Sequence, residues 1–386
     1  MKNKYNFDKL YQRRGTDCVK WDASGDPEML PLWVADMDFP TAPAVIEAVQ
    51  KRAASGIYGY VKVPECYYQS VSDWFGRRHG WRPDTDDIIY IPGIVPALST
   101  LVQALVPEGK GVIFQTPAYN CFFSSVSDNN RKMVKNPLVR VETETGFTFR
   151  IDFELLEKQA ADVDNVLLIL CNPHNPTGRV WSREELEKVS DICRRNNVTV
   201  VSDEIHCEIV HPGNSYIPFA TIDPDCVTCC SPTKGFNIAG LMVSNIIARR
   251  ADLREKINKV IKANESNNAN PFGIVALQAA YNYGAEWLDA LNIYLNDNFR
   301  YLRDTLNSRM PQLKVCDSEA TYLAWVDISG LGITADEVEE RAKTDGHVWV
   351  NSGTMYGNGH YIRINYACQR SRLKDGLDRF CRAFCC

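Results

Sequence analysis

The sequence predicts an α/β protein built on a mostly parallel central sheet. Short apolar runs of strand length alternate with helical patterns, and turn residues directly follow most of these runs. The apolar run 165–170 does not alternate with polar residues, which is typical of strands covered on both faces. Ser182-Arg183-Glu184-Glu185 is a capping box that begins a predicted helix, and this helix ends near Asn196. A strand is then expected at 198–202.

The first elements of the predicted sheet follow the same alternation. A strand is expected at 87–91, where Pro92-Gly93 ends it, and a helix with a strongly apolar surface is expected at 97–106. The next strand is expected at 111–115. Further along, the strands on either side of the Ser182 helix form a strand–helix–strand unit, whose crossover should be right-handed.

The pattern changes after Gly284, where long helices precede two strand-like segments at 321–327 and 361–365. A chain of 386 residues favours a large and a small lobe over a single one. We therefore expect a large domain at 46–284 and a smaller α+β domain at 285–386. Residues 1–45 are expected to contribute to the smaller domain.

Composition and charge exclude several classes of protein. The net charge of −5 and the pI near 5.8 provide no basic field for nucleic acid. The N-terminal residues lack the apolar core of a signal peptide, and no run approaches the roughly 18 apolar residues of a membrane span. The sequence therefore predicts a soluble, cytoplasmic protein that acts without nucleic acid or membrane.

Fourteen cysteines are many for such a protein, and they cluster at 226–230 and 381–386. A disulfide framework is typical of short secreted chains rather than of a long chain without a signal peptide. Zinc binding is a second interpretation of these cysteines, but the clusters lack paired Cys-x-x-Cys spacing with nearby histidines. We expect partly buried free thiols and no metal site.

Chemically active side chains follow several predicted strands directly. Asp203 ends the strand 198–202, the loop 172–178 follows the strand 165–170, and Pro92-Gly93 and 116–119 follow two others. In open α/β sheets, ligands bind beyond the carboxyl ends of the strands. These segments are therefore expected to converge on one ligand.

Lys234 and Asp203 form the most informative pair of residues. A lysine that attacks an aldehyde must be deprotonated, and burial or nearby cations lower its pKa. Lys234 lies between an apolar Cys-rich strand and Gly235, whereas a lone loop lysine is usually solvated. Asp203 has a structural reading as a helix cap or salt-bridge partner, and a functional one as counter-ion to a pyridinium ring. With the Asn-Pro loop before them, these residues suit a Schiff base with pyridoxal 5'-phosphate (PLP).

Four other features fit the same ligand, each with a structural alternative. The helix after Gly93 could bind phosphate through free N–H groups, although many helices begin after Pro-Gly. Tyr119 could stack on a planar ring or simply pack, and Asn175 could donate to a ring oxygen or only form a turn. Arg363 sits in an apolar strand, where it either forms a structural ion pair or clamps a substrate carboxylate.

On these residues the chain resembles the fold-type-I PLP enzymes, the aspartate aminotransferase superfamily. Within them it is similar to the MalY/PatB branch of cystathionine β-lyases, or carbon–sulfur lyases. The resemblance covers about residues 33–372. Its more specific segments are 33–40, 58–60, 172–178, 202–206 and 231–237.

The resemblance implies a large domain with a seven-stranded, mostly parallel sheet flanked by helices. It also implies a homodimer with a shared active site, in which Tyr60 reaches the neighbouring subunit's cofactor. Lys234 would form the internal aldimine, Asp203 would contact the pyridine nitrogen, and Tyr119 would stack on the ring. The other implied cofactor contacts are Asn175, Ile94, Val95, His206, Ser231 and Thr233, and the implied substrate contacts are Arg363, Asn175 and Ala35.

Two positions depart from the aminotransferase pattern. His206 stands three residues after the aspartate, where those enzymes usually carry tyrosine, and histidine there also occurs in the lyase branch. Met242 stands eight residues after the lysine, where those enzymes often carry a phosphate-binding arginine. This second change leaves phosphate binding to hydroxyl groups and backbone amides.

The function that this resemblance implies is β-elimination from cysteine S-conjugates such as cystathionine, giving a thiol, pyruvate and ammonia. Lys234 would remove the Cα proton, and Lys234, Tyr119 or Tyr60 would protonate the leaving group. An aminotransferase would use the same residues, and a regulatory protein that kept the fold is a third interpretation.

Overall fold

The computed structural model describes residues 4–384. Its largest sheet has seven strands in the order β2-β10-β9-β8-β7-β3-β4. All neighbouring pairs are parallel except those of β10, which is antiparallel to both β2 and β9. The predicted mostly parallel, seven-stranded sheet is therefore confirmed. Its strands are β2 (Ile88–Ile91), β3 (Gly111–Thr116), β4 (Lys132–Pro137), β7 (Asn165–Cys171), β8 (Thr199–Asp203), β9 (Val227–Cys230) and β10 (Ser244–Ala248).

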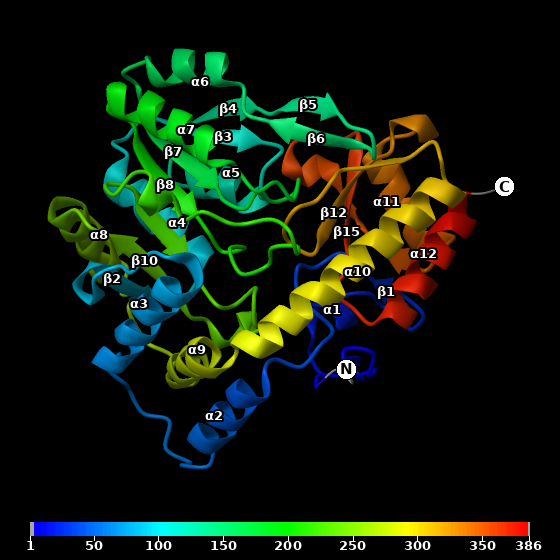
Figure 1. The fold of residues 1–386 in the computed structure, drawn as a ribbon, viewed down its shortest axis with the longest axis horizontal. Coiled ribbons are helices and arrows are strands. Elements are labelled where there is room, and N and C mark those ends of the chain that lie inside the picture. The colour runs from blue at the N-terminus through cyan, green and yellow to red at the C-terminus, as the bar shows by residue number, and fades with distance from the viewer. Residues whose placement is uncertain (1–3, 385–386) are drawn as a thin grey trace.

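The sheet is covered on both faces, as the unbroken apolar run of β7 predicts. Leu167 and Ile169 face one core cluster, which includes side chains of α4 (Ile94–Leu105), α5 (Asn120–Ser127) and α8 (Ala251–Ala263). Leu168 and Leu170 face the other, with α6 (Phe153–Ala160) and α7 (Arg183–Arg195). Successive strand residues point to opposite faces, so a strand with helices on both sides must be apolar throughout. Figure 1 shows these helices around the sheet.

Local sequence signals set several helix ends. The predicted capping box forms at α7: the Ser182 hydroxyl accepts from the Glu185 N–H, and the Glu185 carboxylate accepts from the Ser182 N–H. Helix α4 begins at Ile94, directly after Gly93, where a helix start was expected, and three residues before the apolar helical pattern at 97–106. Pro96 lies in the first turn, where helices need no N–H donor and tolerate proline.

A second part of the chain is built on a four-stranded antiparallel sheet in the order β11-β12-β15-β14. Its strands are β11 (Lys314–Val315), β12 (Leu323–Asp327), β14 (Asn351–Ser352) and β15 (Tyr361–Asn365), with α11 (Ala335–Thr344) and α12 (Arg370–Phe384) beside them. Strand β1 (Leu30–Pro31) pairs with β13 (Val348–Trp349), so the N-terminal segment reaches this part. The domain boundaries at residues 45 and 284 stay predictions.

Long helices connect the two parts. Helix α10 (Ala285–Arg309) runs diagonally in Figure 1 from near α9 (Pro271–Tyr283) to α12. Helices α2 (Pro43–Ala53) and α3 (Glu65–His79) lie on the side of α9. One apolar cluster includes α3, α9, α10 and the second sheet, so the two parts share a continuous core. None of the helices within residues 4–384 combines the length and apolar character that crossing a bilayer requires.

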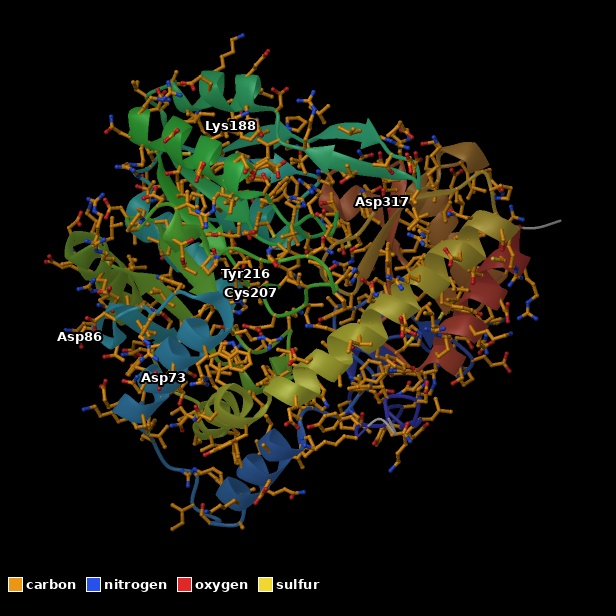
Figure 2. The ribbon with its side chains drawn as sticks, in the orientation of Figure 1. Asp73, Asp86, Lys188, Cys207, Tyr216 and Asp317 are labelled. Atoms are coloured by element: carbon orange, nitrogen blue, oxygen red, sulfur yellow. The ribbon has the colours of Figure 1, made fainter. Side chains whose placement is uncertain are left out.

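The interior holds polar and thiol groups as well as apolar ones. Cys207 and Tyr216 are buried and lie near the centre of the view in Figure 2, whereas the exposed Asp86 and Lys188 lie nearer its outline. The thiols clustered at 226–230 are free and buried, as expected. Two further cysteines, Cys385 and Cys386, lie outside the described residues.

Candidate active site

One cavity of about 420 Å³ collects nearly all of the predicted site residues. It lies at the carboxyl ends of β2, β7, β8 and β9, as the positions of the loops after these strands predict. The second sheet closes it through Arg363 of β15, and the N-terminal segment adds residues 33–35. The predicted residues that line it are Ala35, Ile94, Val95, Tyr119, Asn175, Asp203, His206, Thr233, Lys234 and Arg363.

Lys234 follows β9 in a turn and points its amine into this cavity. The Lys234 Nζ donates to the Ala35 carbonyl oxygen at 2.7 Å, and the Tyr322 hydroxyl donates to the same oxygen at 3.0 Å. Desolvation lowers the pKa of Lys234 to about 8, and the Arg363 charge acts in the same direction. Both effects were expected for a nucleophilic lysine, since each disfavours the ammonium form.

The backbone behind Lys234 is tightly packed. A Cβ added at Gly235 would lie 2.8 Å from the Glu208 Cβ, closer than such atoms approach in proteins. Asn237 fixes the next turn, because its side-chain amide donates to the Met37 and Phe39 carbonyl oxygens at 2.9 and 2.8 Å. The loop that carries Lys234 is thus held between Glu208 and the N-terminal segment.

Asp203 ends β8 as a buried carboxylate, 2% exposed. Its Oδ1 accepts from the Ile205 N–H at 3.2 Å, and no described residue between 4 and 384 forms an ion pair with it. Desolvation raises the pKa of Asp203 to about 7. Among the described residues Asp203 is therefore not a salt-bridge partner, and a buried acid of this kind suits a cationic ligand group.

His206 lies in the same turn and is neutral. Desolvation lowers its pKa to about 3, and the charges of Lys234 and Arg363 act in the same direction. Its ring Nδ1 is buried without a hydrogen-bond partner among the described residues. A buried polar atom at a cavity wall is available to a bound ligand.

Arg363 is buried in β15, 3% exposed, yet it has no carboxylate partner among residues 4–384. Its Nη2 donates to the Trp33 carbonyl oxygen at 3.1 Å and its Nη1 to the Asn175 Oδ1 at 3.3 Å. The guanidinium also lies 4.6 Å from the ring centroid of Tyr356. The structural ion pair considered for Arg363 is thus not formed, and the charge remains available to an anion.

The start of α4 lines the cavity and can hold a phosphate. This helix begins at Ile94, and no side chain caps the amides of its first turn. Thr233 and Ser244 also line the cavity, and the Ser244 hydroxyl is buried without a partner among the described residues. Ser231 does not line the cavity: its hydroxyl donates to the Val243 carbonyl oxygen at 2.6 Å and contacts the Thr233 hydroxyl at 2.8 Å. Met242 lines the cavity, so this wall carries no cation at that position.

Tyr119 and Tyr60 occupy very different places. Tyr119 lines the cavity at the start of α5, and desolvation raises its pKa, so its hydroxyl keeps the proton. Tyr60 is fully exposed in the extended segment between α2 and α3 and does not reach the cavity of its own chain. The structure therefore brings together the predicted residues except Tyr60 and Ser231.

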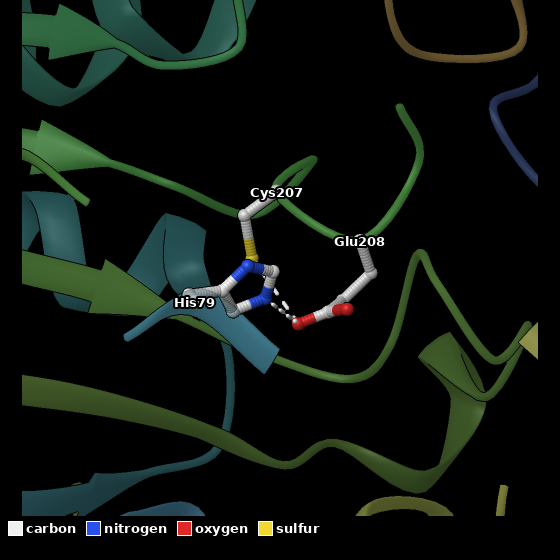
Figure 3. Close-up of side chains that lie close together, drawn as sticks. All are labelled: His79, Cys207 and Glu208. Carbon is white, nitrogen blue, oxygen red and sulfur yellow. Dashed lines mark hydrogen bonds and ion pairs between the residues drawn. The ribbon is translucent and has the colours of Figure 1, made fainter. Parts of the chain in front are cut away.

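A second polar cluster lies behind the lysine loop. Figure 3 shows the His79 ring between Cys207 and Glu208, with His79 Nε2 2.9 Å from the Glu208 carboxylate. These three residues could ligate a metal, but the Glu208 carboxylate is already paired with Arg78 at 3.2 Å and accepts from the Trp74 indole N–H at 2.6 Å. The cation and the donors reduce its attraction for a metal ion, so we interpret the cluster as support for the loop.

Sequence reasoning missed several wall residues, namely Trp33, Asn351, Met355 and Tyr356, and also Tyr322, whose hydroxyl donates to the Ala35 carbonyl oxygen of the wall. No local signal distinguishes most of them, because they reach the cavity only when the second sheet packs against the first. Tyr322 is the one residue that a local signal could have found, because a tyrosine hydroxyl in a predicted buried strand (321–327) needs a hydrogen-bond partner.

The comparisons with known proteins agree with this geometry. The model of the family "Aminotransferase class I and II" matches residues 27–380. The chain is 40% identical to cystathionine beta-lyase PatB of Bacillus subtilis (strain 168), over 97% of this chain and 98% of that protein. A crystal structure of cystalysin from Treponema denticola, which contains a pyridoxal 5'-phosphate cofactor, has a TM-score of 0.93 at 33% identity, covering 98% of each chain.

A PLP-bound C–S lyase from Staphylococcus hominis has a TM-score of 0.90 at 36% identity, covering 99% of this chain and 98% of that one. These similarities extend over both sheets and over every segment that lines the cavity. This chain therefore belongs to the family of class I and II aminotransferases.

Proposed function

We propose that this protein is a PLP-dependent carbon–sulfur β-lyase, which converts cysteine S-conjugates into a thiol, pyruvate and ammonia. The observation that carries the proposal is the set of three unpaired charged groups in one cavity: the Lys234 amine, the Asp203 carboxylate and the Arg363 guanidinium. Relatives named cystathionine beta-lyase and C–S lyase support the reaction class.

The residues present fit PLP. The buried acid at the end of β8 suits the protonated ring nitrogen, and the uncapped first turn of α4 suits the phosphate. When bound, PLP supplies an electron sink that stabilises negative charge at the substrate Cα. The residues that would hold it are Lys234 through a covalent bond at Nζ, Asp203 at the ring nitrogen, Asn175 at the ring hydroxyl, Tyr119 and His206 beside the ring, and Ile94, Val95 and Thr233 at the phosphate, with Ser231 behind Thr233.

Arg363 binds and orients the substrate in this proposal. Its planar fork offers two parallel N–H groups to the α-carboxylate, and Trp33 and Asn175 hold the fork in place. Ala35 and Asn175 complete the substrate contacts near it. This arrangement leaves the substrate Cα beside Lys234.

Lys234 moves the Cα proton. With a pKa lowered to about 8, the amine is a free base in about one tenth of molecules at pH 7 and in about half at pH 8, far more than for an ordinary lysine, so Nζ can accept this proton. The Ala35 carbonyl oxygen, 2.7 Å away, gives the amine a fixed position. Tyr119 keeps its hydroxyl proton, because burial raises its pKa. The proton for the leaving sulfur would come from Lys234, after it has accepted the Cα proton, or from Tyr119 or Tyr60.

A homodimer completes the site in this proposal. Tyr60 is fully exposed next to two other exposed apolar side chains, Ile57 (75%) and Tyr58 (58%). Such a segment suits burial against a second copy of the chain, where Tyr60 would reach the partner's cofactor.

The direct test is the release of pyruvate and free thiol from S-propyl-L-cysteine. Replacing Lys234→Ala should lower kcat by at least ~10²–10⁴-fold, because a positioned proton acceptor is lost. The exposed Lys188 gives a control, since Lys188→Ala removes an amine outside the cavity. Full elimination activity in Lys234→Ala would contradict the proposal. Amino-group exchange between an amino acid and a 2-oxo acid, without pyruvate release from the conjugate, would assign an aminotransferase instead.

A further inference from the structure

The charged groups of the cavity are fully used by the cofactor and by the α-amino acid part of the substrate. Of the cavity-lining residues within 4–384, only Asp203, Lys234 and Arg363 can carry a charge near neutral pH. His206 also lines it, but burial lowers its pKa to about 3 and keeps it neutral. In the function proposed above, Asp203 pairs with the pyridine nitrogen, Lys234 is bonded covalently to the cofactor, and Arg363 pairs with the α-carboxylate. None is left for the substituent on sulfur.

Charged side chains behind the wall are already paired. Asp36 forms ion pairs with Arg13 at 2.8 Å and Lys20 at 3.4 Å. Glu339 pairs with Lys343 at 2.6 Å and also accepts from the Ser352 N–H at 2.6 Å. Neither carboxylate lines the cavity, so neither can turn toward a ligand without breaking these contacts.

The part of the wall next to Arg363 is apolar and rigid. Trp33 stacks on Trp349 with ring centroids 4.2 Å apart and planes 10° from parallel, and its indole N–H donates to the Lys20 carbonyl oxygen at 3.2 Å. Asn351 Nδ2 links this wall by donating to the Trp33 carbonyl oxygen and to the Tyr356 hydroxyl, each at 3.0 Å. Met355 completes it.

We propose that the enzyme prefers cysteine conjugates whose sulfur substituent is uncharged, and that Trp33, Met355 and Tyr356 form the wall that receives it. This inference rests on the lyase function proposed above. Cystathionine carries a second ammonium and a second carboxylate on its substituent, and no described residue that lines the cavity is left to serve as a counter-ion for either. To the extent that these charges leave water against the wall they stay unpaired, which is costly, whereas an alkyl group gains from leaving water.

A matched series of substrates tests the preference. S-propyl-, S-(3-aminopropyl)- and S-(3-carboxypropyl)-L-cysteine have the same chain length as cystathionine and differ only in the charges that it carries. The kcat/KM for pyruvate release by the holoenzyme should be highest for the S-propyl conjugate and at least ~10-fold lower for cystathionine. Equal values across the four would overturn the inference. A higher value for the carboxypropyl than for the propyl conjugate would also overturn it, because it would reveal a cation reaching the cavity from a partner subunit.

A variant with an added charge identifies the wall. Met355 is 44% exposed, so Met355→Lys can place an ammonium at the cavity without disturbing the core. The ratio of kcat/KM for the carboxypropyl over the propyl conjugate should rise about fivefold, the effect of an exposed ion pair of ~1 kcal/mol. Met133 is equally exposed (43%) on the edge strand β4, and Met133→Lys should leave the ratio unchanged. An unchanged ratio in Met355→Lys would overturn the assignment of this wall.

A binding measurement separates this inference from the proposed reaction. 2-Aminoheptanoate and 2,7-diaminosuberate replace the sulfur of the propyl conjugate and of cystathionine by a methylene group. Calorimetry on the holoenzyme should give 2-aminoheptanoate a Kd at least ~10-fold lower. If none of the four conjugates released pyruvate but this difference held, the lyase function would fail while the preference stood. Equal Kd values would overturn the preference, whatever the activity.

Discussion

Arg363→Lys tests how the cavity recognises the substrate. The arginine fork can offer two parallel N–H groups to one carboxylate, whereas a lysine ammonium keeps the charge but not this geometry. A hydrogen bond to a charged group contributes ~1.5–3 kcal/mol, so the loss of one should weaken binding by ~10–150-fold. The stacking on Tyr356, 4.6 Å from the guanidinium, is lost as well. We expect a rise in KM that exceeds any fall in kcat.

The assay compares a ligand that has the carboxylate with one that lacks it. The Kd of L-alanine for the holoenzyme should rise by ~10–150-fold in Arg363→Lys. The Kd of ethylamine, which lacks the carboxylate, should not change. Arg140 is a matched control, because it also lies over a ring (Phe147, 3.9 Å) but is paired with Glu142 and Asp327. Arg140→Lys should leave both constants within about twofold. Wild-type affinity of Arg363→Lys for L-alanine would refute the assignment of the carboxylate site.

Three further predictions concern the cofactor end of the cavity. The rate at which PLP attaches to the apoenzyme should rise with pH and level off above about 8, because the Lys234 amine reacts only when deprotonated; a midpoint near 10.5 would contradict the lowered pKa. Gly235→Ala should destabilise the fold by ~1–3 kcal/mol in thermal unfolding and lower the PLP content measured by absorbance, because its Cβ would collide with Glu208. Gly240→Ala, whose Cβ would meet open space, should change neither the stability nor the PLP content. Met242→Arg should lower the Kd of PLP by ~10-fold or more by adding a cation at the phosphate end, and an unchanged Kd would place the phosphate elsewhere.

The sheet and the rim of the site could be predicted because local sequence determines them. Strand β7 is an apolar run that ends at a turn, and the capping box at Ser182 marks the next helix, so the strand ends and the residues after them follow directly. The start of α4 after Gly93 could also be predicted, because proline is tolerated in the first helical turn, although the apolar helical pattern begins only at residue 97.

The walls of the site could not be predicted in this way. Whether Arg363 has an ion-pair partner depends on which carboxylates the fold brings near it, and the sequence does not state this. Trp33 lines the cavity and meets Arg363, which lies 330 residues further along the chain. The Tyr322 hydroxyl meets the Ala35 carbonyl oxygen, 287 residues away. Both contacts arise from long-range packing. Tyr60 is exposed within its own chain, so its role depends on a second copy.

The central claim is that the Lys234 amine is the group that binds PLP covalently. The protein, loaded with PLP, is reduced with borohydride and digested, and the peptides are analysed by mass spectrometry. The account predicts that the reduced cofactor is attached to Nζ of Lys234 alone. Attachment to another lysine, or an unmodified Lys234 in protein that retains activity, would contradict it.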